Sequence, residues 1–323
     1  MSLGDDSTIN ERDPLLSSDQ RQEYNSGSQY KFNNDVTAVH NTPIDGNGPL
    51  PFQKDQSSKI EIPQDRNTTR SYDDLKDLEQ EEFLAEFIGT LVLVFLTCGF
   101  CAEQTLNIEN SKSWLTSSLG SGLSVLIAIC IAGHVSGGHL NPAITIAFTV
   151  FSGFPIRKAP SYIAAQFLGA FTGAALLYTI VEPAITQFDH GKRQILGELG
   201  TASIFGTYPP LYVGTGSAVV SEIMGTALLL MVVMVTGHPN NLPFRTAQGA
   251  MIALGITTIS LCIGYTSGFS LNPARDFGPR LFTAVAGWGL DVFRVHHYYA
   301  LVPMFSPILG GLLGGFIYTV FID

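Results

Sequence analysis

Long apolar stretches alternate with short polar segments from residue 83 to the end of the chain. A helix needs about 20 residues to cross a bilayer, and six of these stretches approach or exceed that length. They lie near 83–102, 119–135, 160–181, 216–237, 247–266 and 299–322. Almost no Lys or Arg falls inside them. The pattern therefore predicts six membrane-spanning helices, not the buried helices of a large soluble protein.

The first 82 residues have a different character. They carry 8 Lys+Arg and 17 Asp+Glu, a net charge of −9 out of −10 for the whole chain. They show no apolar periodicity and cannot bury enough surface to offset chain entropy. We predict a disordered acidic tail over 1–82 and a membrane domain over 83–323. The tail does not have the form of a signal peptide, so the first span is expected to direct insertion and to leave the tail in the cytosol.

The apolar part of the chain contains an internal duplication. GGHLNPAIT at 137–145 matches GFSLNPARD at 268–276. Upstream, AEFIGTLVLVF at 85–95 matches SEIMGTALLLM at 221–231. Two matches in the same order and at nearly the same separation indicate two copies of one structural unit.

The two repeats cover 83–182 and 215–322, and each contains three predicted spans. An odd number of spans places the second repeat upside down in the membrane. The copies are then related by a pseudo-two-fold axis in the membrane plane. The predicted fold is an all-α membrane protein built from inverted three-helix repeats.

Each repeat carries the tripeptide Asn-Pro-Ala, which begins at Asn141 and at Asn272. Proline is favoured at the first helical position, and Asn just before it is a good N-cap. Short helices are therefore expected over 143–151 and 274–282. Neither can span, so each enters the membrane halfway, one from each face. Irregular backbone at that depth must be buried or line a water-filled cavity. We expect the two Asn amides to lie at the centre of a pore, beside free backbone carbonyls.

This arrangement selects among solutes. The positive ends of both half-helix dipoles point at the pore centre and disfavour cations there. Amide donors and carbonyl acceptors suit neutral solutes that carry hydroxyl groups. A water held by both Asn amides is poorly placed to relay a proton to its neighbours.

The doubled motif and its surroundings resemble the aquaporin (major intrinsic protein) family over about 83–322. FSLNPARDFGPRLFTAVAGWG at 269–289 is similar to the glycerol-facilitator (aquaglyceroporin) branch, while GHVSGGHLNPA at 133–143 is more similar to water channels. Asp276, directly after Arg275, marks the glycerol branch and is counted among the pore residues. The resemblance implies six spans with two re-entrant half-helices, a homotetramer with one pore per subunit, and passive flux of water and small neutral solutes such as glycerol.

The resemblance also implies a constriction of four positions, placed by their spacing from the two Asn residues. Arg275 is its one charge, and Phe269 fits its aromatic wall. Ser260 stands where water-selective members place a His, and Ser121 stands where glycerol facilitators often place an aromatic. Trp114, two turns from Ser121, is not expected to replace that aromatic. This set predicts a wider and more polar filter that passes glycerol as well as water.

Glu86 and Glu222 are acidic residues inside predicted spans, one in each repeat. Charges at such depth are costly and mark functional sites by default. One interpretation is an ion-coupling site, which would make the protein an ion-coupled secondary transporter of a small polar solute. The other is that each carboxylate accepts hydrogen bonds from the nearby re-entrant loop. Their symmetric placement favours the structural role, with His139 in the same polar network.

Other classes of function find little support in the sequence. The chain has no GxSxG or HExxH motif and no His/Asp cluster, so we do not expect an enzyme. It has no basic patch for a nucleic acid. Its four cysteines lie in apolar spans, and neither a metal site nor a cofactor is expected. We predict a passive channel in a lipid bilayer.

One short motif lies in the tail. Glu11, Leu15 and Leu16 have the acidic dileucine form ExxxLL, which resembles a signal for sorting toward endosomes or the vacuole. It predicts a sorting adaptor as partner. The expected location is an endosomal or vacuolar membrane or the plasma membrane.

Overall fold

The computed structural model of the protein describes residues 72–107 and 113–323, with side chains from residue 76 on. Six helices within these residues are long and apolar enough to cross a membrane. They are α2 (Tyr72–Leu106), α3 (Trp114–Ser136), α5 (Ala159–Asp189), α6 (Thr215–Gly237), α8 (Gln248–Ile263, continued as a 3-10 turn to Thr266) and α11 (Leu301–Phe321). The prediction of an all-α protein with six spanning helices is confirmed.

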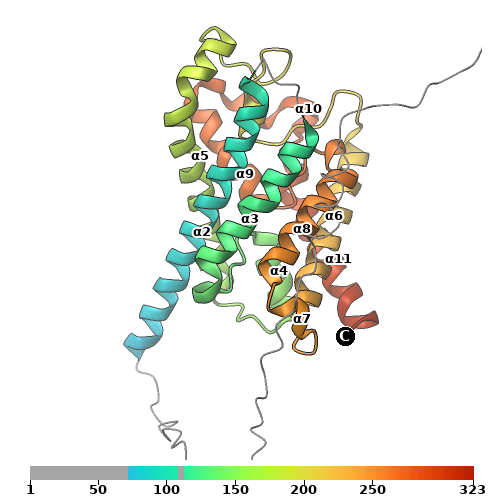
Figure 1. Cartoon of the computed structure of the whole chain (residues 1–323). Coiled ribbons are helices and arrows are strands. Elements are labelled where there is room, and N and C mark those ends of the chain that lie inside the picture. The colour runs from blue at the N-terminus through green and yellow to red at the C-terminus, as the bar shows by residue number, and fades with distance from the viewer. Residues whose placement is uncertain (1–71, 108–112) are drawn as a thin grey trace, which may run out of the picture. The chain divides into compact units, whose positions relative to one another are not determined.

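Two shorter helices follow the Asn-Pro-Ala tripeptides. They are α4 (Pro142–Phe151) and α9 (Pro273–Thr283). The side-chain oxygen of each preceding Asn accepts the N–H of the alanine two residues on, at 2.9 Å in both copies. Figure 1 shows α4 in the lower half of the bundle and α9 in the upper half. The two half-helices therefore enter from opposite ends, as the inverted repeat requires.

The remaining elements are short and connect the spans. They are η1 (Ala202–Ile204), α7 (Leu242–Arg245), η2 (Gly264–Thr266), η3 (Ala284–Trp288), η4 (Leu290–Phe293) and α10 (Val295–Tyr298).

Close helix pairs repeat the internal symmetry. In the first repeat α2 packs on α5, and in the second α6 packs on α11. A Cβ atom at Gly169 or Gly173 of α5 would collide with backbone carbonyls of α2. A Cβ at Gly310 or Gly314 of α11 would collide in the same way with carbonyls of α6. Glycines at four-residue spacing thus let both pairs approach closely.

The half-helices exchange places between the repeats. The half-helix α4 packs mainly on α11 of the second repeat, and α9 packs mainly on α5 of the first. A Cβ at Gly278 of α9 would lie 2.6 Å from the side chain of Ala170 in α5. Each repeat therefore completes the interior of the other.

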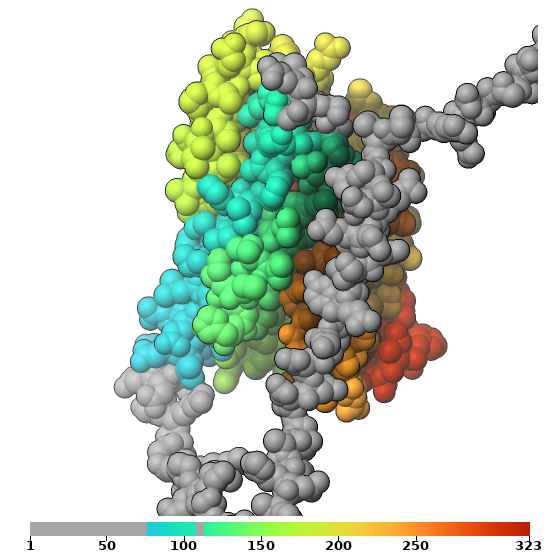
Figure 2. Space-filling view, in the orientation of Figure 1, coloured from blue at the N-terminus to red at the C-terminus, as the bar shows by residue number. Residues whose placement is uncertain are grey.

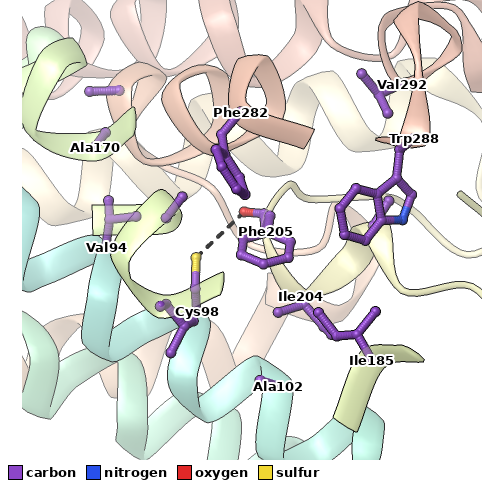
Figure 3. Packing of buried hydrophobic residues seen from close by; sticks show 14 residues of the cluster. Val94, Cys98, Ala102, Ala170, Ile185, Ile204, Phe205, Phe282, Trp288 and Val292 are labelled. Carbon is purple, nitrogen blue, oxygen red and sulfur yellow. Dashed lines mark hydrogen bonds between the residues drawn. The ribbon is translucent and has the colours of Figure 1, made fainter. Parts of the chain in front are cut away.

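An apolar cluster fixes the long connection between α5 and α6 against the bundle. Val94 and Cys98 of α2, Phe205 of the connection and Phe282 of α9 are all buried in it. Figure 3 shows Phe205 between α2 and α9, with the Cys98 thiol 3.8 Å from its carbonyl oxygen. The cluster holds the connection beside α9.

Outward-facing apolar residues mark the side of α3 turned away from the bundle. Leu115, Leu119, Leu123 and Ile127 recur every four residues and are all exposed. In Figure 2 α3 runs in green next to the cyan α2. A stripe of this kind suits contact with lipid tails or with another apolar helix.

Two predicted boundaries differ from the structure. The prediction of disorder is wrong for 72–82, because α2 already begins at Tyr72. The span continues as helix into this acidic segment, where Lys158 donates to both carboxylate oxygens of Glu82 at 2.8 Å. The first repeat also runs past residue 182, since α5 continues to Asp189 through Pro183. The rest of the tail, with Glu11, Leu15 and Leu16, lies outside the described residues.

Candidate functional site

The loops before α4 and α9 meet inside the bundle and are tied to each other. Asn141 Nδ2 donates to the carbonyl oxygen of Leu271, and Asn272 Nδ2 donates to that of Leu140, both at 2.8 Å. Leu140 and Leu271 have φ angles of 55° and 50°, which are uncommon for residues other than glycine. An amide carries two N–H donors. Each Asn therefore holds the opposite loop with one donor and has a second one left for a solute.

The Glu86 carboxylate binds the first loop, which precedes α4. Its Oε1 accepts the Ser136 hydroxyl at 2.7 Å and the His139 N–H at 2.8 Å. Its Oε2 accepts the Leu140 N–H and the Gln166 side-chain amide, both at 2.7 Å. The carboxylate is completely buried. It thus provides the acceptors that the irregular backbone lacks.

Glu222 does the same for the second loop. Its carboxylate accepts the N–H of Ser270 at 3.0 Å and the N–H of Leu271 at 2.8 Å, and it too is completely buried. Both acidic residues therefore bind two consecutive backbone N–H groups of their own repeat's loop. These contacts support the structural interpretation over an ion-coupling site.

His139 belongs to the polar network of the first loop. Its ring Nδ1 lies 3.2 Å from the Thr145 hydroxyl, which also accepts the Gln166 amide at 3.0 Å. Its ring packs edge-on against Phe154, with centroids 4.7 Å apart. His139 also lines the cavity described next.

Two cavities follow one another along the loops. The inner cavity, about 140 Å³, extends from Gln248 at the start of α8 past both Asn residues to Phe269 and Arg275. The outer cavity, about 180 Å³, extends from Phe269 and Arg275 to Tyr208 in the α5–α6 connection. Ser121, Phe269 and Arg275 line both and mark their junction. Together the cavities outline a pathway between the two ends of the bundle.

Arg275 brings a fixed positive charge to this junction. Its Nη1 donates to the carbonyl oxygen of Phe205 at 2.9 Å, and its backbone N–H donates to Asn272 Oδ1 at 3.2 Å. The side chain is buried. The apolar cluster around Phe205 thus orients the guanidinium at the point where the cavities meet.

The two serines of the predicted filter lie at different places. Ser121 lines both cavities, and its hydroxyl donates to the Ser117 carbonyl oxygen of its own helix at 2.9 Å. Ser260 lines only the outer cavity, and its hydroxyl lies 2.8 Å from that of Ser118. Both hydroxyls form hydrogen bonds within the protein. Because serine is a small residue, neither side chain fills much of the cavity that it lines.

The structure places Asp276 differently from the prediction. Among the described residues, neither cavity lining includes Asp276. Its carboxylate pairs with Arg280 Nε at 2.8 Å and accepts the Thr207 N–H at 2.7 Å, and both charged groups are buried. One residue after Arg275 is about 100° further around the helix, which turns Asp276 away from the pathway. Its role is to anchor the α5–α6 connection.

Trp114 has contacts that the sequence does not predict. It lines the outer cavity together with Ser121 and Ser260. Its indole Nε1 donates to the Ser260 carbonyl oxygen at 2.9 Å. The signal in the sequence is the seven-residue spacing from Ser121, which puts both on one face of α3.

The α5–α6 connection supplies residues of the outer cavity wall that no pattern in the sequence predicts. Thr207 and Tyr208 line the outer cavity. The Arg280 guanidinium lies 4.4 Å from the centre of the Tyr208 ring. Burial raises the pKa of Tyr208 to about 12, although this cation acts in the opposite direction. The phenol therefore stays neutral throughout the physiological range.

The described residues contain no group of three or more His, Cys, Asp or Glu placed to hold a metal ion.

The chain is also similar to known proteins. The profile of the family described as "Major intrinsic protein" matches residues 75–318. The chain belongs to the major intrinsic protein family. The predicted resemblance to aquaporins is confirmed, and members of this family are membrane channels, not enzymes.

Individual relatives agree with this assignment. Aquaporin-2 of Rhizopus delemar is 77% identical over 325 residues, covering the full length of both chains. Aquaglyceroporin-2 of Rhizophagus irregularis is 44% identical over 239 residues, 74% of this chain and 76% of that protein. The X-ray structure of the aquaglyceroporin from Plasmodium falciparum superposes with a TM-score of 0.69 at 29% identity, covering 76% of this chain and 97% of that one.

Proposed function

We propose that this channel conducts glycerol and similar small polyols as well as water, driven only by their concentration gradients. The junction of the two cavities carries the proposal. Its wall combines one aromatic, Phe269, one cation, Arg275, and one small residue, Ser121. The aromatic suits the carbon backbone of a polyol, and the guanidinium suits its hydroxyl groups. A serine in place of a bulky side chain leaves room for a solute wider than water.

The buried acids favour a channel over an ion-coupled secondary transporter. Coupling would need acids on the pathway that gain and lose a proton during transport. Among the described residues, the linings of both cavities leave out Glu86 and Glu222. Each is instead occupied by backbone donors of its own loop. This supports passive flux.

We place the N-terminus on the cytosolic side and expect a homotetramer with one pore per subunit. Arg157, Lys158 and Arg245 lie in connections at the end of the bundle where α2 begins, and Lys192, Arg193 and Arg294 lie in connections at the other end, so the basic residues favour neither orientation. The orientation rests instead on the first span acting as the insertion signal after a polar tail. The tetramer rests on the family assignment. Sorting through Glu11, Leu15 and Leu16 to an endosomal or vacuolar membrane, with the plasma membrane as the alternative, remains a proposal from the sequence.

Stopped-flow light scattering on proteoliposomes tests the function. Vesicles that contain the protein should shrink faster than empty vesicles in an impermeant osmolyte, and should reswell faster in glycerol. The initial rate should rise linearly with the glycerol gradient and be unaffected by a protonophore. Glycerol entry no faster than in empty vesicles would remove the polyol from the proposal. Accumulation against a gradient would instead point to a coupled transporter.

A further inference from the structure

We propose that Trp114 forms a second aromatic wall of the filter and sets the upper size of the solutes that pass. The inference rests on the proposed function, because it names the residue that limits the polyol pathway. It also revises the expectation that Trp114 does not replace the aromatic that is missing at Ser121.

The position of Trp114 on α3 puts it in line with the junction. It lies seven residues before Ser121, almost two full turns, so both residues face the same way. Ser117 lies between them, and all three line the outer cavity. A solute that approaches the junction through this cavity therefore passes the indole ring before it reaches Ser121.

Contacts with α8 hold the indole close to the filter. Its Nε1 donates to the Ser260 carbonyl oxygen at 2.9 Å. The Ser260 hydroxyl lies 2.8 Å from that of Ser118, one turn along from Trp114. Thr257 adds a third link, since its hydroxyl lies 3.4 Å from the Ser118 carbonyl oxygen. The ring is thus tied to Ser260, a residue at one of the four filter positions.

The chemistry of the junction gives this ring its effect. Phe269 is the one aromatic among the described residues that line the junction, and Ser121 is too small to oppose it. Trp114 supplies aromatic surface from the outer side, where Ser121 leaves space. A linear polyol can then keep its carbon edge against two rings while Arg275 binds its hydroxyls. A longer or bulkier polyol meets the indole first.

Three variants test this role in proteoliposomes, with the permeabilities to water, glycerol and the four-carbon polyol erythritol measured on each. Trp114→Ala removes the ring and its N–H, whereas Trp114→Phe keeps a smaller aromatic ring and also removes the N–H. Leu115→Ala is the control, since Leu115 is the adjacent residue and is exposed on the outer face of the bundle.

Trp114→Ala should raise the erythritol-to-glycerol permeability ratio about threefold or more, because the pore diameter sets the size limit. Trp114→Phe should raise the ratio less than Trp114→Ala, because a smaller ring remains, and Leu115→Ala should keep the ratio of the unmodified protein. An unchanged ratio in Trp114→Ala overturns the inference. So does an equal increase in Trp114→Phe, which would assign the effect to the hydrogen bond with Ser260. If the alanine variant fails to fold, Trp114→Leu decides, with an expected rise of about twofold.

The outcome is separable from that of the proposed function. If the unmodified channel passes water but not glycerol, the polyol proposal fails. The inference is then judged by glycerol alone. A gain of glycerol permeability in Trp114→Ala supports a limiting indole, and no gain overturns it.

Discussion

Replacing Glu86 by Gln tests whether this carboxylate is a scaffold for the first loop. In the structure, one of its oxygens accepts the His139 N–H and the other accepts the Leu140 N–H. A glutamine carries an NH₂ group in place of one oxygen. Whichever way the amide is turned, one of these backbone N–H groups faces another donor in a fully buried site.

The size of the effect follows from these contacts. A buried donor left without an acceptor costs about 1–3 kcal/mol, and the surviving bonds lose the strength that the negative charge gave them. Ser136 can redirect its hydroxyl to the Ala132 carbonyl oxygen, 3.3 Å away, which limits the loss. We expect Glu86→Gln to lower the free energy of unfolding by about 2–3 kcal/mol. For a domain of this size that lowers Tm by about 4–12 °C.

The assay is thermal unfolding in detergent, paired with stopped-flow water permeability per folded protein. Glu82→Gln is the matched control, because Glu82 lies four residues earlier on α2 and pairs with Lys158, not with the loop. The ion pair between Glu82 and Lys158 is partly exposed, so Glu82→Gln should lower the free energy of unfolding by less than about 1 kcal/mol. If Glu86→Gln unfolds like the unmodified protein but loses or alters its flux under a proton gradient, the scaffold interpretation is refuted and an ion-coupling acid takes its place.

Three further predictions concern the filter, the outer connection and the tail. Ser260→His should lower glycerol permeability much more than water permeability, because it places bulk and a donor near Arg275; an equal fall in both, measured at matched protein density, would contradict the assigned filter position. Asp276→Asn leaves a buried guanidinium without its counter-charge and should destabilise the protein by about 3–5 kcal/mol, measured as a loss of thermal stability in detergent. Leu15→Ala combined with Leu16→Ala should move the protein from internal membranes to the cell surface, as seen by microscopy of a tagged chain; an unchanged distribution would exclude the sorting motif.

Local signals in the sequence account for the main elements of the fold. Hydrophobic length is enough to find the six spans, and an Asn N-cap followed by Pro is enough to place α4 and α9 within one residue at each end. The duplication supplied the relation between the halves. It also indicated the matching roles of Glu86 and Glu222, since an acid in each repeat at the same distance from a loop can serve the same purpose twice.

Residues whose position depends on distant contacts were not predicted correctly. Asp276 is adjacent to Arg275 in sequence, but its direction is set by Arg280 and by the α5–α6 connection. That connection has no periodicity from which its fold could be derived. Trp114 needed knowledge of α8, because its indole is held by Ser260, 146 residues away. Acidic composition predicts disorder up to residue 82, whereas α2 begins at Tyr72.

The reciprocal bonds between the two loops also set the order in which the chain can mature. Asn141 bonds to a carbonyl 130 residues later, and Asn272 bonds to one 132 residues earlier. A ribosome adds about 5–20 residues per second, so the first loop waits roughly ten seconds for its partner. During that time Asn141 and the Leu140 carbonyl lack these bonds inside the bilayer, where an unpaired polar group costs several kcal/mol. Until the second half arrives, these groups need other partners, such as water or neighbouring protein. A chain truncated before residue 271 lacks both the acceptor for Asn141 and the donor for the Leu140 carbonyl.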